Sequence, residues 1–290
     1  LMNLYGGSLG FYNSYSWAAI AAATPYVYGT GVTGNQRQDW LNARYILMWG
    51  WNPAEMRDGT NSEYFVRLAR EKGARVVCVD PRLTLSAVAL ADEWVPIRPG
   101  TDAAMMTAMA HVMVSEGLHD AGFVRSHCVG FDGAQMPAGA EGEESYEDYL
   151  FGRRDGVPKT PDWAEPICAV PRATIARLAR EYAATRPGVL YQGYGMQRRA
   201  YGEQVVRAGC VLAALAGNVG IPGGIPNRTT VCATVDAATF GNGSTDATAA
   251  IRNAITACPE DQVVFLPPGT YRITEPIQLM SNLTLRGAGM

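Results

Sequence analysis

No two of the six cysteines in this sequence stand in a C-x-x-C spacing. Zinc and iron–sulfur centres are commonly built from such local pairs, so the sequence argues against both kinds of centre. Four of the cysteines lie in apolar surroundings, which is typical of small buried hydrophobic residues. The other two, Cys232 and Cys258, would pair as a disulfide in an exported protein, and the sequence does not decide between this pair and free thiols.

The chain also lacks an excess of positive charge and a long apolar run. Its formal net charge of −3 leaves no basic surface of the kind that binds nucleic acid. No apolar run approaches the roughly 18 residues that span a bilayer. The first residues, Leu1–Leu4, have neither the basic stretch nor the cleavage site of a signal peptide. We therefore expect no nucleic acid partner and no direct membrane span.

What is present indicates a soluble globular protein. The length of 290 residues suits one large domain or two ordinary ones, and 48% of the residues are hydrophobic and 18% charged. We expect the sequence to be a piece of a longer protein, because it has no initiator methionine and because Gly287–Met290 directly follows strand-like sequence.

Short apolar runs alternate with helical patterns over the first three-quarters of the chain. Strands are predicted at 45–49, 76–79, 94–97 and 189–192, and helices at 62–72, 102–116, 171–185 and 202–216. Strands that alternate with helices are typical of βαβ units. The predicted fold class is therefore α/β, with a Rossmann-like parallel sheet and flanking helices.

Polar residues and glycines follow each predicted strand where the chain leaves the sheet. They are Asn52 and Glu55, then Asp80 and Arg82, then Arg98 and Asp102, and finally Gly193 and Gly195. Ligands of open α/β sheets bind beyond the carboxyl ends of the strands. Thr101 is placed to cap the helix that begins at residue 102. The pattern alone leaves two interpretations open, a nucleotide pocket or a set of polar loops.

Ser16 precedes an alanine-rich helix that is predicted to stop before Pro25. On local grounds this serine is a helix N-cap. His111 lies midway along the helix predicted at 102–116, and no second ligand stands four residues away. It is interpreted as a packed core residue, and the two other histidines are isolated as well.

Residues 229–290 differ in character from the rest. Short strands are predicted at 263–266, 273, 277–279 and 283–285, separated by glycine, asparagine and proline. This spacing predicts the first coils of a small β-helix (β-solenoid). Two domains are therefore predicted, at 1–224 and 229–290.

Several motifs in order carry a resemblance over residues 1–224. They are L-Y-G-G-S-L-G-F-Y-N-S-Y-S, G-W-N-P-A-E, V-D-P-R-L-T-L-S-A, W-V-P-I-R-P-G-T-D, Y-Q-G-Y-G-M-Q-R and A-L-A-G-N-V-G-I-P-G-G. This segment resembles the catalytic subunit of the dimethyl sulfoxide reductase family of molybdopterin oxidoreductases. The resemblance implies a bis(molybdopterin guanine dinucleotide) molybdenum cofactor and oxygen-atom transfer from a small S- or N-oxide.

The resemblance also assigns roles to residues. Ser16 matches the serine whose oxygen ligates molybdenum and is the catalytic residue implied. The cofactor-binding residues implied are Asn52, Glu55, Asp80, Arg82, Thr84, Pro99, Gly100, Asp102, Gly193, Gly195 and Gln197. Among them, Asp102 matches a carboxylate that accepts hydrogen bonds from guanine. The chemistry belongs to the cofactor, and the protein holds and tunes it.

Two departures from the family pattern stand out. The resemblance leads us to expect cysteine ligands for an iron–sulfur cluster at the start of the subunit and later domains that close over the second dinucleotide, and neither pattern is found within residues 1–290. By resemblance, the full protein would be periplasmic or exported, and would work with an iron–sulfur electron-transfer subunit and a membrane anchor subunit.

Residues 229–290 resemble a second family through D-A-A-T-F-G-N-G-S-T-D-A-T-A-A-I-R-N-A-I, V-V-F-L-P-P-G-T-Y-R-I and S-N-L-T-L-R-G-A-G. These motifs are similar to the amino-terminal cap of pectate-lyase-like right-handed β-helix proteins. The matching segment ends before the coils that carry catalytic carboxylates in that family. The alternatives are thus a polysaccharide-binding or polysaccharide-cleaving protein, and a non-functional fusion or assembly artefact joined near Gly224.

Overall fold

The computed structural model describes residues 16–29, 37–56, 61–224, 231–259, 263–267, 269–278 and 284–287. The chain forms two compact units, one of residues 1–219 and 223–225, the other of residues 220–222 and 226–290. None of the helices in the described ranges combines the length and the apolar character that crossing a bilayer requires.

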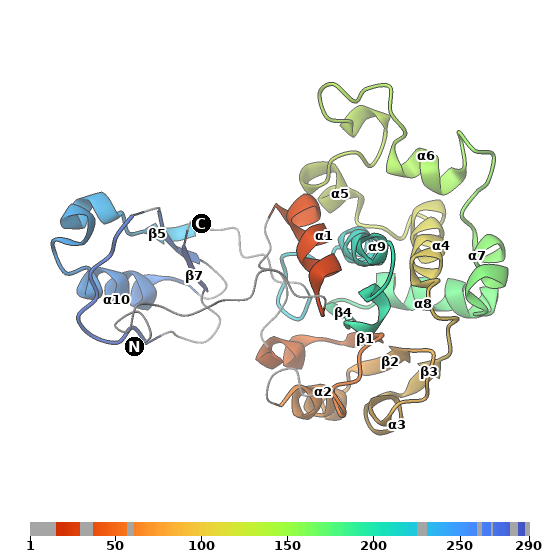
Figure 1. Cartoon of the computed structure of the whole chain (residues 1–290), viewed down its shortest axis with the longest axis horizontal. Coiled ribbons are helices and arrows are strands. Elements are labelled where there is room, and N and C mark those ends of the chain that lie inside the picture. The colour runs from red at the N-terminus through yellow and green to blue at the C-terminus, as the bar shows by residue number, and fades with distance from the viewer. Residues whose placement is uncertain are drawn as a thin grey trace. The chain divides into compact units, whose positions relative to one another are not determined.

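The first unit is built on a four-stranded parallel sheet in the order β3-β2-β1-β4 (Figure 1). The strands are β1 (Tyr45–Trp49), β2 (Arg75–Val79), β3 (Glu93–Val95) and β4 (Gly188–Gln192). Because all four strands are parallel, their carboxyl ends meet at one edge of the sheet. The strand order reverses between β1 and β4, which is the switch point where ligands of open sheets bind.

Helices cover both faces of this sheet (Figure 1). On one side lie α2 (Ser62–Glu71) and α3 (Leu85–Leu90), and on the other lie α4 (Asp102–Ser115), α8 (Arg172–Ala184) and α9 (Gly202–Leu215). Side chains alternate along β1, so Leu47 and Trp49 join the core under α4, α8 and α9, whereas Ile46 and Met48 join the core under α2 and α3. The helices are α1 (Ala18–Tyr28), η2 (Arg37–Asn42), α2 (Ser62–Glu71), α3 (Leu85–Leu90), α4 (Asp102–Ser115), α5 (Ala121–His127), η3 (Gly133–Gln135), α6 (Tyr146–Phe151), α7 (Pro161–Cys168), α8 (Arg172–Ala184), η4 (Gly195–Gln197) and α9 (Gly202–Leu215).

The predicted strands and the longer predicted helices of this unit are confirmed within one or two residues. The short helices α3, α6 and α7 are not predicted from the sequence. The prediction that the first helix stops before Pro25 is wrong, because α1 continues through this proline to residue 28. The buried Ala23 packs against Val206 of α9, and this packing stabilises a helix that its proline would otherwise disfavour.

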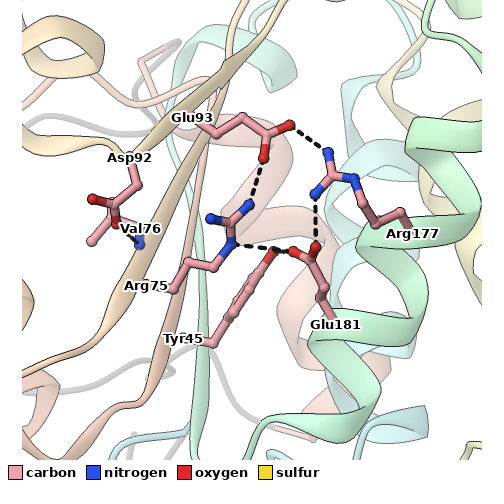
Figure 2. A network of polar contacts seen from close by, with 7 residues as sticks. All are labelled: Tyr45, Arg75, Val76, Asp92, Glu93, Arg177 and Glu181. Atoms are coloured by element: carbon pink, nitrogen blue, oxygen red, sulfur yellow. Dashed lines mark hydrogen bonds and ion pairs between the residues drawn. The ribbon is translucent and has the colours of Figure 1, made fainter.

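A network of charged side chains lies at the amino edge of the sheet (Figure 2). Glu181 of α8 accepts hydrogen bonds from Tyr45 Oη at 2.9 Å, Arg177 Nη1 at 2.7 Å and Arg75 Nε at 3.3 Å. Glu93 accepts one from Arg75 Nη2 at 2.6 Å and another from Arg177. Tyr45, Arg75 and Glu93 are the first residues of β1, β2 and β3, so the network ties helix α8 to three strands.

The second unit contains a three-stranded parallel sheet in the order β5-β6-β7. Its elements are β5 (Val231–Thr234), η5 (Ala237–Gly243), α10 (Thr248–Ala257), β6 (Val263–Leu266) and β7 (Thr284–Gly287). Ile251 and Ile255 of α10 form a small core with Val264 of β6. A disulfide joins Cys232 to Cys258, which selects one of the two states that the sequence left open.

The strands predicted at 273 and 277–279 are not formed in the described residues 269–278. Only an isolated bridge between Asp246 and Arg272 occurs there. Pro276 removes a backbone donor from this stretch, and β6 pairs directly with β7. The strand predicted at 283–285 corresponds to β7, although residue 283 itself lies outside the described residues.

Candidate functional site

The carboxyl edge of the four-stranded sheet collects all the predicted cofactor-binding residues. Asn52 and Glu55 follow β1, and Asp80, Arg82 and Thr84 follow β2. Pro99, Gly100 and Asp102 come after β3 at the start of α4, and Gly193, Gly195 and Gln197 follow β4. The parallel sheet thus brings together segments that lie up to 145 residues apart in the chain, from Asn52 to Gln197.

The loops after β1 and β2 are joined through Ser86, a buried residue of α3. Its hydroxyl donates to Asn52 Oδ1 at 2.7 Å and accepts from the backbone N–H of Ala54 at 2.9 Å. At the surface, Arg82 forms an ion pair of 3.5 Å with Glu55. Asn52 is therefore held in place by the protein, while Arg82 and Glu55 remain largely exposed to solvent.

Asp80 and Thr84 are both buried, and both support the loop between β2 and α3. The Asp80 carboxylate accepts the backbone N–H of Arg82 at 2.8 Å. Thr84 is the N-cap of α3, and its Oγ1 accepts the backbone N–H of Ala87 at 3.1 Å. The hydroxyl of Thr84 therefore caps helix α3, a structural role that the sequence motif did not predict.

Asp102 lies buried at the first turn of α4, across the end of β1. Its Oδ1 accepts a hydrogen bond from Trp49 Nε1 at 3.0 Å, and its Oδ2 lies 3.8 Å from Arg199 Nη2. Burial raises the pKa of Asp102, against the opposing effects of the Trp49 bond and the Arg199 charge. Burial also raises the pKa of Asp80, and the nearby Asp102 carboxylate adds to the rise. Two buried carboxylates with raised pKa values thus lie at this edge, and such perturbed groups are common at binding sites.

The glycines after β4 lie close to the backbone that follows β1. A side chain at the buried Gly193 would overlap the carbonyl oxygen of Gly50, and a Cβ at Gly195 would lie 3.2 Å from the same oxygen. These glycines let the loops after β1 and β4 touch each other at the switch point. At Gly193, the absence of a side chain therefore allows a close approach of two backbone segments of the protein itself.

Gln197 and Ser16 lie side by side although they are 181 residues apart. Gln197 Nε2 donates to the Ser16 carbonyl oxygen at 2.8 Å, and Gln197 Oε1 accepts the backbone N–H of Ala19 at 3.1 Å. Arg198 Nε also donates to the Ser16 oxygen, at 3.1 Å. The interpretation of Ser16 as an N-cap is wrong, because Trp17 occupies that position and makes no side-chain cap bond. Ser16 is exposed and is anchored to the loop after β4.

Two further expectations at this edge are corrected. The Arg98 guanidinium points to α7, where its Nη1 donates to the carbonyl oxygens of Pro166 at 3.0 Å and Ile167 at 2.8 Å. It satisfies carbonyl groups at the carboxyl end of that helix, so the guanidinium is turned away from the edge where it was expected. Thr101 occupies the N-cap position of α4, but its Oγ1 donates to the Arg98 carbonyl at 2.7 Å and does not cap the helix.

Sequence reasoning missed three residues of the site: Trp49, Ser86 and Arg199. Trp49 and Ser86 are buried, and the sequence pattern does not distinguish them from ordinary core residues. Arg199 extends from the segment between η4 and α9 to Gly100, where any Cβ would overlap its guanidinium. No local sequence pattern predicts this contact, because the two residues are 99 positions apart.

The residues of this edge fit a guanine nucleotide by the chemistry of their donors and acceptors. Asp102 offers a buried carboxylate, which suits the N–H groups of a base. Arg82 and Arg199 offer guanidinium groups, which suit phosphate. In the described ranges, no group of three or more histidine, cysteine or acidic residues is arranged to hold a metal ion. A metal at this edge would therefore depend on other donors, such as the hydroxyl of Ser16.

An open α/β sheet with polar side chains gathered beyond its strand ends belongs to the class of proteins that bind ligands at this edge. The model of the family "Molybdopterin oxidoreductase" matches residues 1–271, and the chain belongs to this family. The match continues past Gly224 and through much of the segment predicted as a β-helix. The comparisons therefore lend no support to a separate pectate-lyase-like segment.

The curated relatives are reductases of S- and N-oxides. Dimethyl sulfoxide reductase DmsA of Escherichia coli (strain K12) is 45% identical over 227 residues, which cover 77% of this chain and 28% of the relative. A trimethylamine-N-oxide reductase of Haemophilus influenzae is 35% identical over 234 residues, with 77% and 27% covered. The chain thus spans little more than a quarter of the length of these relatives.

Among solved structures, acetylene hydratase from Pelobacter acetylenicus superimposes with a TM-score of 0.57 and 24% identity. The alignment covers 73% of this chain and 26% of that enzyme. This likeness supports the fold, a parallel α/β sheet with flanking helices.

Proposed function

We propose that this chain is the part of a molybdenum-dependent oxidoreductase that holds one guanosine of a bis(molybdopterin guanine dinucleotide) cofactor. The full enzyme would transfer an oxygen atom from a small S- or N-oxide. The observation that supports this most is the convergence of four strand ends on one edge, with Asp102 buried among them, in a chain that is 45% identical to a dimethyl sulfoxide reductase over 227 residues.

Each part of the edge has a role in this proposal. Asp102 accepts hydrogen bonds from the guanine base, with Trp49 fixing the carboxylate through Oδ1. Asn52 lies beside the nucleoside on a loop that Ser86 holds in place. Arg82, with a side chain 71% exposed, faces phosphate. The chain's own work is to bind and orient the nucleotide.

Ser16 is the molybdenum ligand in this proposal. A serine alkoxide is a hard oxygen donor that suits a high-valent metal. When bound, the metal centre would supply the two-electron chemistry of oxygen-atom transfer. Gln197 and Arg198 position Ser16 by holding its backbone oxygen, so the serine is fixed next to the segment expected to line the pterin.

The proposal is tested by metal and nucleotide analysis of the chain purified from a host that makes the cofactor. The unmodified chain should carry molybdenum and release guanine nucleotide on denaturation. Ser16→Ala should lower the molybdenum content at least tenfold and keep the nucleotide, whereas Asp102→Asn should lower both. Ser126→Ala is the matched control, because that hydroxyl is exposed and its bonds among the described residues all lie within its own helix α5, to the carbonyl oxygens of Gly122 and Phe123 and to His127. An unmodified chain with neither molybdenum nor guanine nucleotide would refute the proposal.

The partners and location of the full protein follow from the same proposal. Electrons would reach the molybdenum from an iron–sulfur subunit linked to a membrane anchor subunit, and the complex would lie in the periplasm. The disulfide between Cys232 and Cys258 supports an oxidising compartment. Fractionation of the source cells, with the chain detected by antibody, tests the location, and recovery in the cytoplasm would contradict it.

The second unit supports a different candidate function, polysaccharide binding by a β-helix. The supporting observation is a sheet of three parallel strands stacked in chain order, β5-β6-β7, as in successive coils of a solenoid. Stacked coils bury their core only against further coils, so this unit would need more than three strands to close. Retention on pectin or alginate beads would favour this candidate function, and complete elution at low salt would refute it. Sequencing the source DNA across Gly224 tests the fusion artefact.

A further inference from the structure

Arg199 is the cation closest to the buried Asp102 among the ion pairs of the described residues, and neither the motifs nor the family resemblance assigns it a role. It lies between η4 and α9, after β4, and reaches across to the turn that precedes α4. Its side chain is 31% exposed, whereas the side chain of Asp102 is 7% exposed. The guanidinium therefore covers a buried carboxylate while keeping one side open to solvent.

The contact between these two groups is electrostatic. Arg199 Nη2 and Asp102 Oδ2 are 3.8 Å apart, which is longer than a hydrogen bond. The ion pair itself thus occupies none of the five N–H donors of the guanidinium. A planar guanidinium with available donors is suited to bidentate binding of phosphate.

The backbone beneath Arg199 is shaped to receive it. Gly100 adopts a φ of +97°, and a Cβ there would overlap the guanidinium. Only glycine satisfies both the backbone conformation and the space that Arg199 needs. Gly100, which the resemblance places in the cofactor site, therefore provides the space in which the Arg199 side chain packs.

We propose that Arg199 is a phosphate-binding residue of the nucleotide site, held over Gly100 by Asp102 until a guanine nucleotide binds. This inference rests on the proposed function and adds a residue to it. The guanine base donates hydrogen bonds to the Asp102 carboxylate, and the Arg199 guanidinium then pairs with the phosphate of the same nucleotide. Arg199 thereby links recognition of the base to recognition of the phosphate.

The experiment measures binding of two probes, GDP and guanosine, to the full chain by isothermal titration calorimetry at pH 7.5. Both probes carry the base, and only GDP carries phosphate. Arg199→Gln should weaken GDP binding about tenfold and change guanosine binding less than twofold. Arg199→Lys should recover part of the GDP affinity, because a lysine keeps the charge but not the bidentate geometry.

The matched control is Arg207→Gln, which removes one positive charge from the exposed face of α9 near the same segment. It should leave both affinities unchanged, and thermal unfolding monitored by tryptophan fluorescence should show that all variants remain folded. An equal loss of GDP and guanosine affinity in Arg199→Gln would show that the arginine acts only through Asp102 and would overturn the inference. No loss of GDP affinity would overturn it as well.

Failure of the proposed function gives a different result. In that case the unmodified chain binds neither probe, and Asp102→Asn is indistinguishable from it. If the unmodified chain binds GDP and Asp102→Asn does not, the proposed nucleotide site stands whatever Arg199 does.

Discussion

Replacing Glu181 by alanine should destabilise the first unit, because this one carboxylate holds three partners at the amino edge of the sheet (Figure 2). It accepts hydrogen bonds from Tyr45, Arg177 and Arg75 at 2.9, 2.7 and 3.3 Å. The substitution leaves a tyrosine hydroxyl and two guanidinium groups with fewer acceptors. Helix α8 then loses its direct link to the first residues of β1 and β2.

The size of the effect follows from the exposure of these groups. Hydrogen bonds to charged groups contribute about 1.5–3 kcal/mol when buried. The side chains of Glu181, Arg75 and Arg177 are 28%, 41% and 40% exposed, so solvent screens the network and roughly 0.5–1 kcal/mol for each bond is more realistic. Three bonds give a loss of about 1.5–3 kcal/mol. For a unit of this size, that loss lowers the melting temperature by about 3–12 °C.

Tryptophan fluorescence reports on this unit alone, because all six tryptophans of the sequence lie within residues 1–219. Urea unfolding of the Glu181→Ala variant should give a lower midpoint at pH 7. The partners hold the pKa of Glu181 below its ordinary value despite its partial burial. The carboxylate therefore stabilises the fold above the ordinary glutamate pKa, and the difference from the unmodified chain should shrink as the pH falls below about 4.

Glu116→Ala is the matched control, because Glu116 accepts two bonds from Arg180 in an isolated surface pair with side chains 37% and 54% exposed. It should cost less than about 1 kcal/mol. If Glu181→Ala costs no more than Glu116→Ala, the network adds nothing beyond an ordinary surface ion pair, and the reasoning is refuted.

Two further predictions concern the site and the second unit. Burial raises the pKa of Asp102, so the folded chain binds the proton more tightly than the unfolded chain, and stability falls as pH rises above the ordinary aspartate pKa of about 4 toward the raised value. Asp102→Asn should reduce this slope in urea titrations between pH 4 and 7, and an unchanged slope would contradict the assignment. Cys232→Ser removes a disulfide between residues 26 positions apart. It should lower the free energy of unfolding of the second unit by about 3–4 kcal/mol, as measured by far-ultraviolet circular dichroism. The tryptophan transition should stay in place, and a shift of equal size in both signals would show that the two units unfold together.

The central strands could be predicted from the sequence because burial on both faces leaves a continuous apolar run. Tyr45–Trp49 is buried at every position, and the run is bounded by polar residues and glycine. Helix α3 could not be predicted in this way, since its six residues expose Leu85 and Val88 and show no amphipathic pattern. The path of α1 through Pro25 depends on packing against α9, which is a tertiary effect.

The sequence predicted which loops form the candidate site, but it did not predict which side chains contact one another there. Asp80 and Asp102 stand out because they follow strand ends, and both are indeed buried at the same edge. The partners of Arg98 could not be foreseen, because the carbonyl groups it binds belong to α7, a helix without a sequence signal. Arg199 was missed for the same reason: its position relative to Gly100 depends on the fold of the whole sheet.

The carboxylates at the two edges of the sheet differ in how their ionisation affects folding. At the amino edge, Glu181 and Glu93 each meet two arginines, and the pKa of Glu181 is held low, so ionisation and folding favour each other. At the carboxyl edge, the pKa values of Asp80 and Asp102 are raised, so their ionised forms oppose folding. A carboxylate that costs stability in the free chain gains more from a ligand that donates hydrogen bonds to it. By this argument the buried carboxylates of the carboxyl edge, Asp80 and Asp102, are the ones that we expect to gain from hydrogen bonds donated by a ligand.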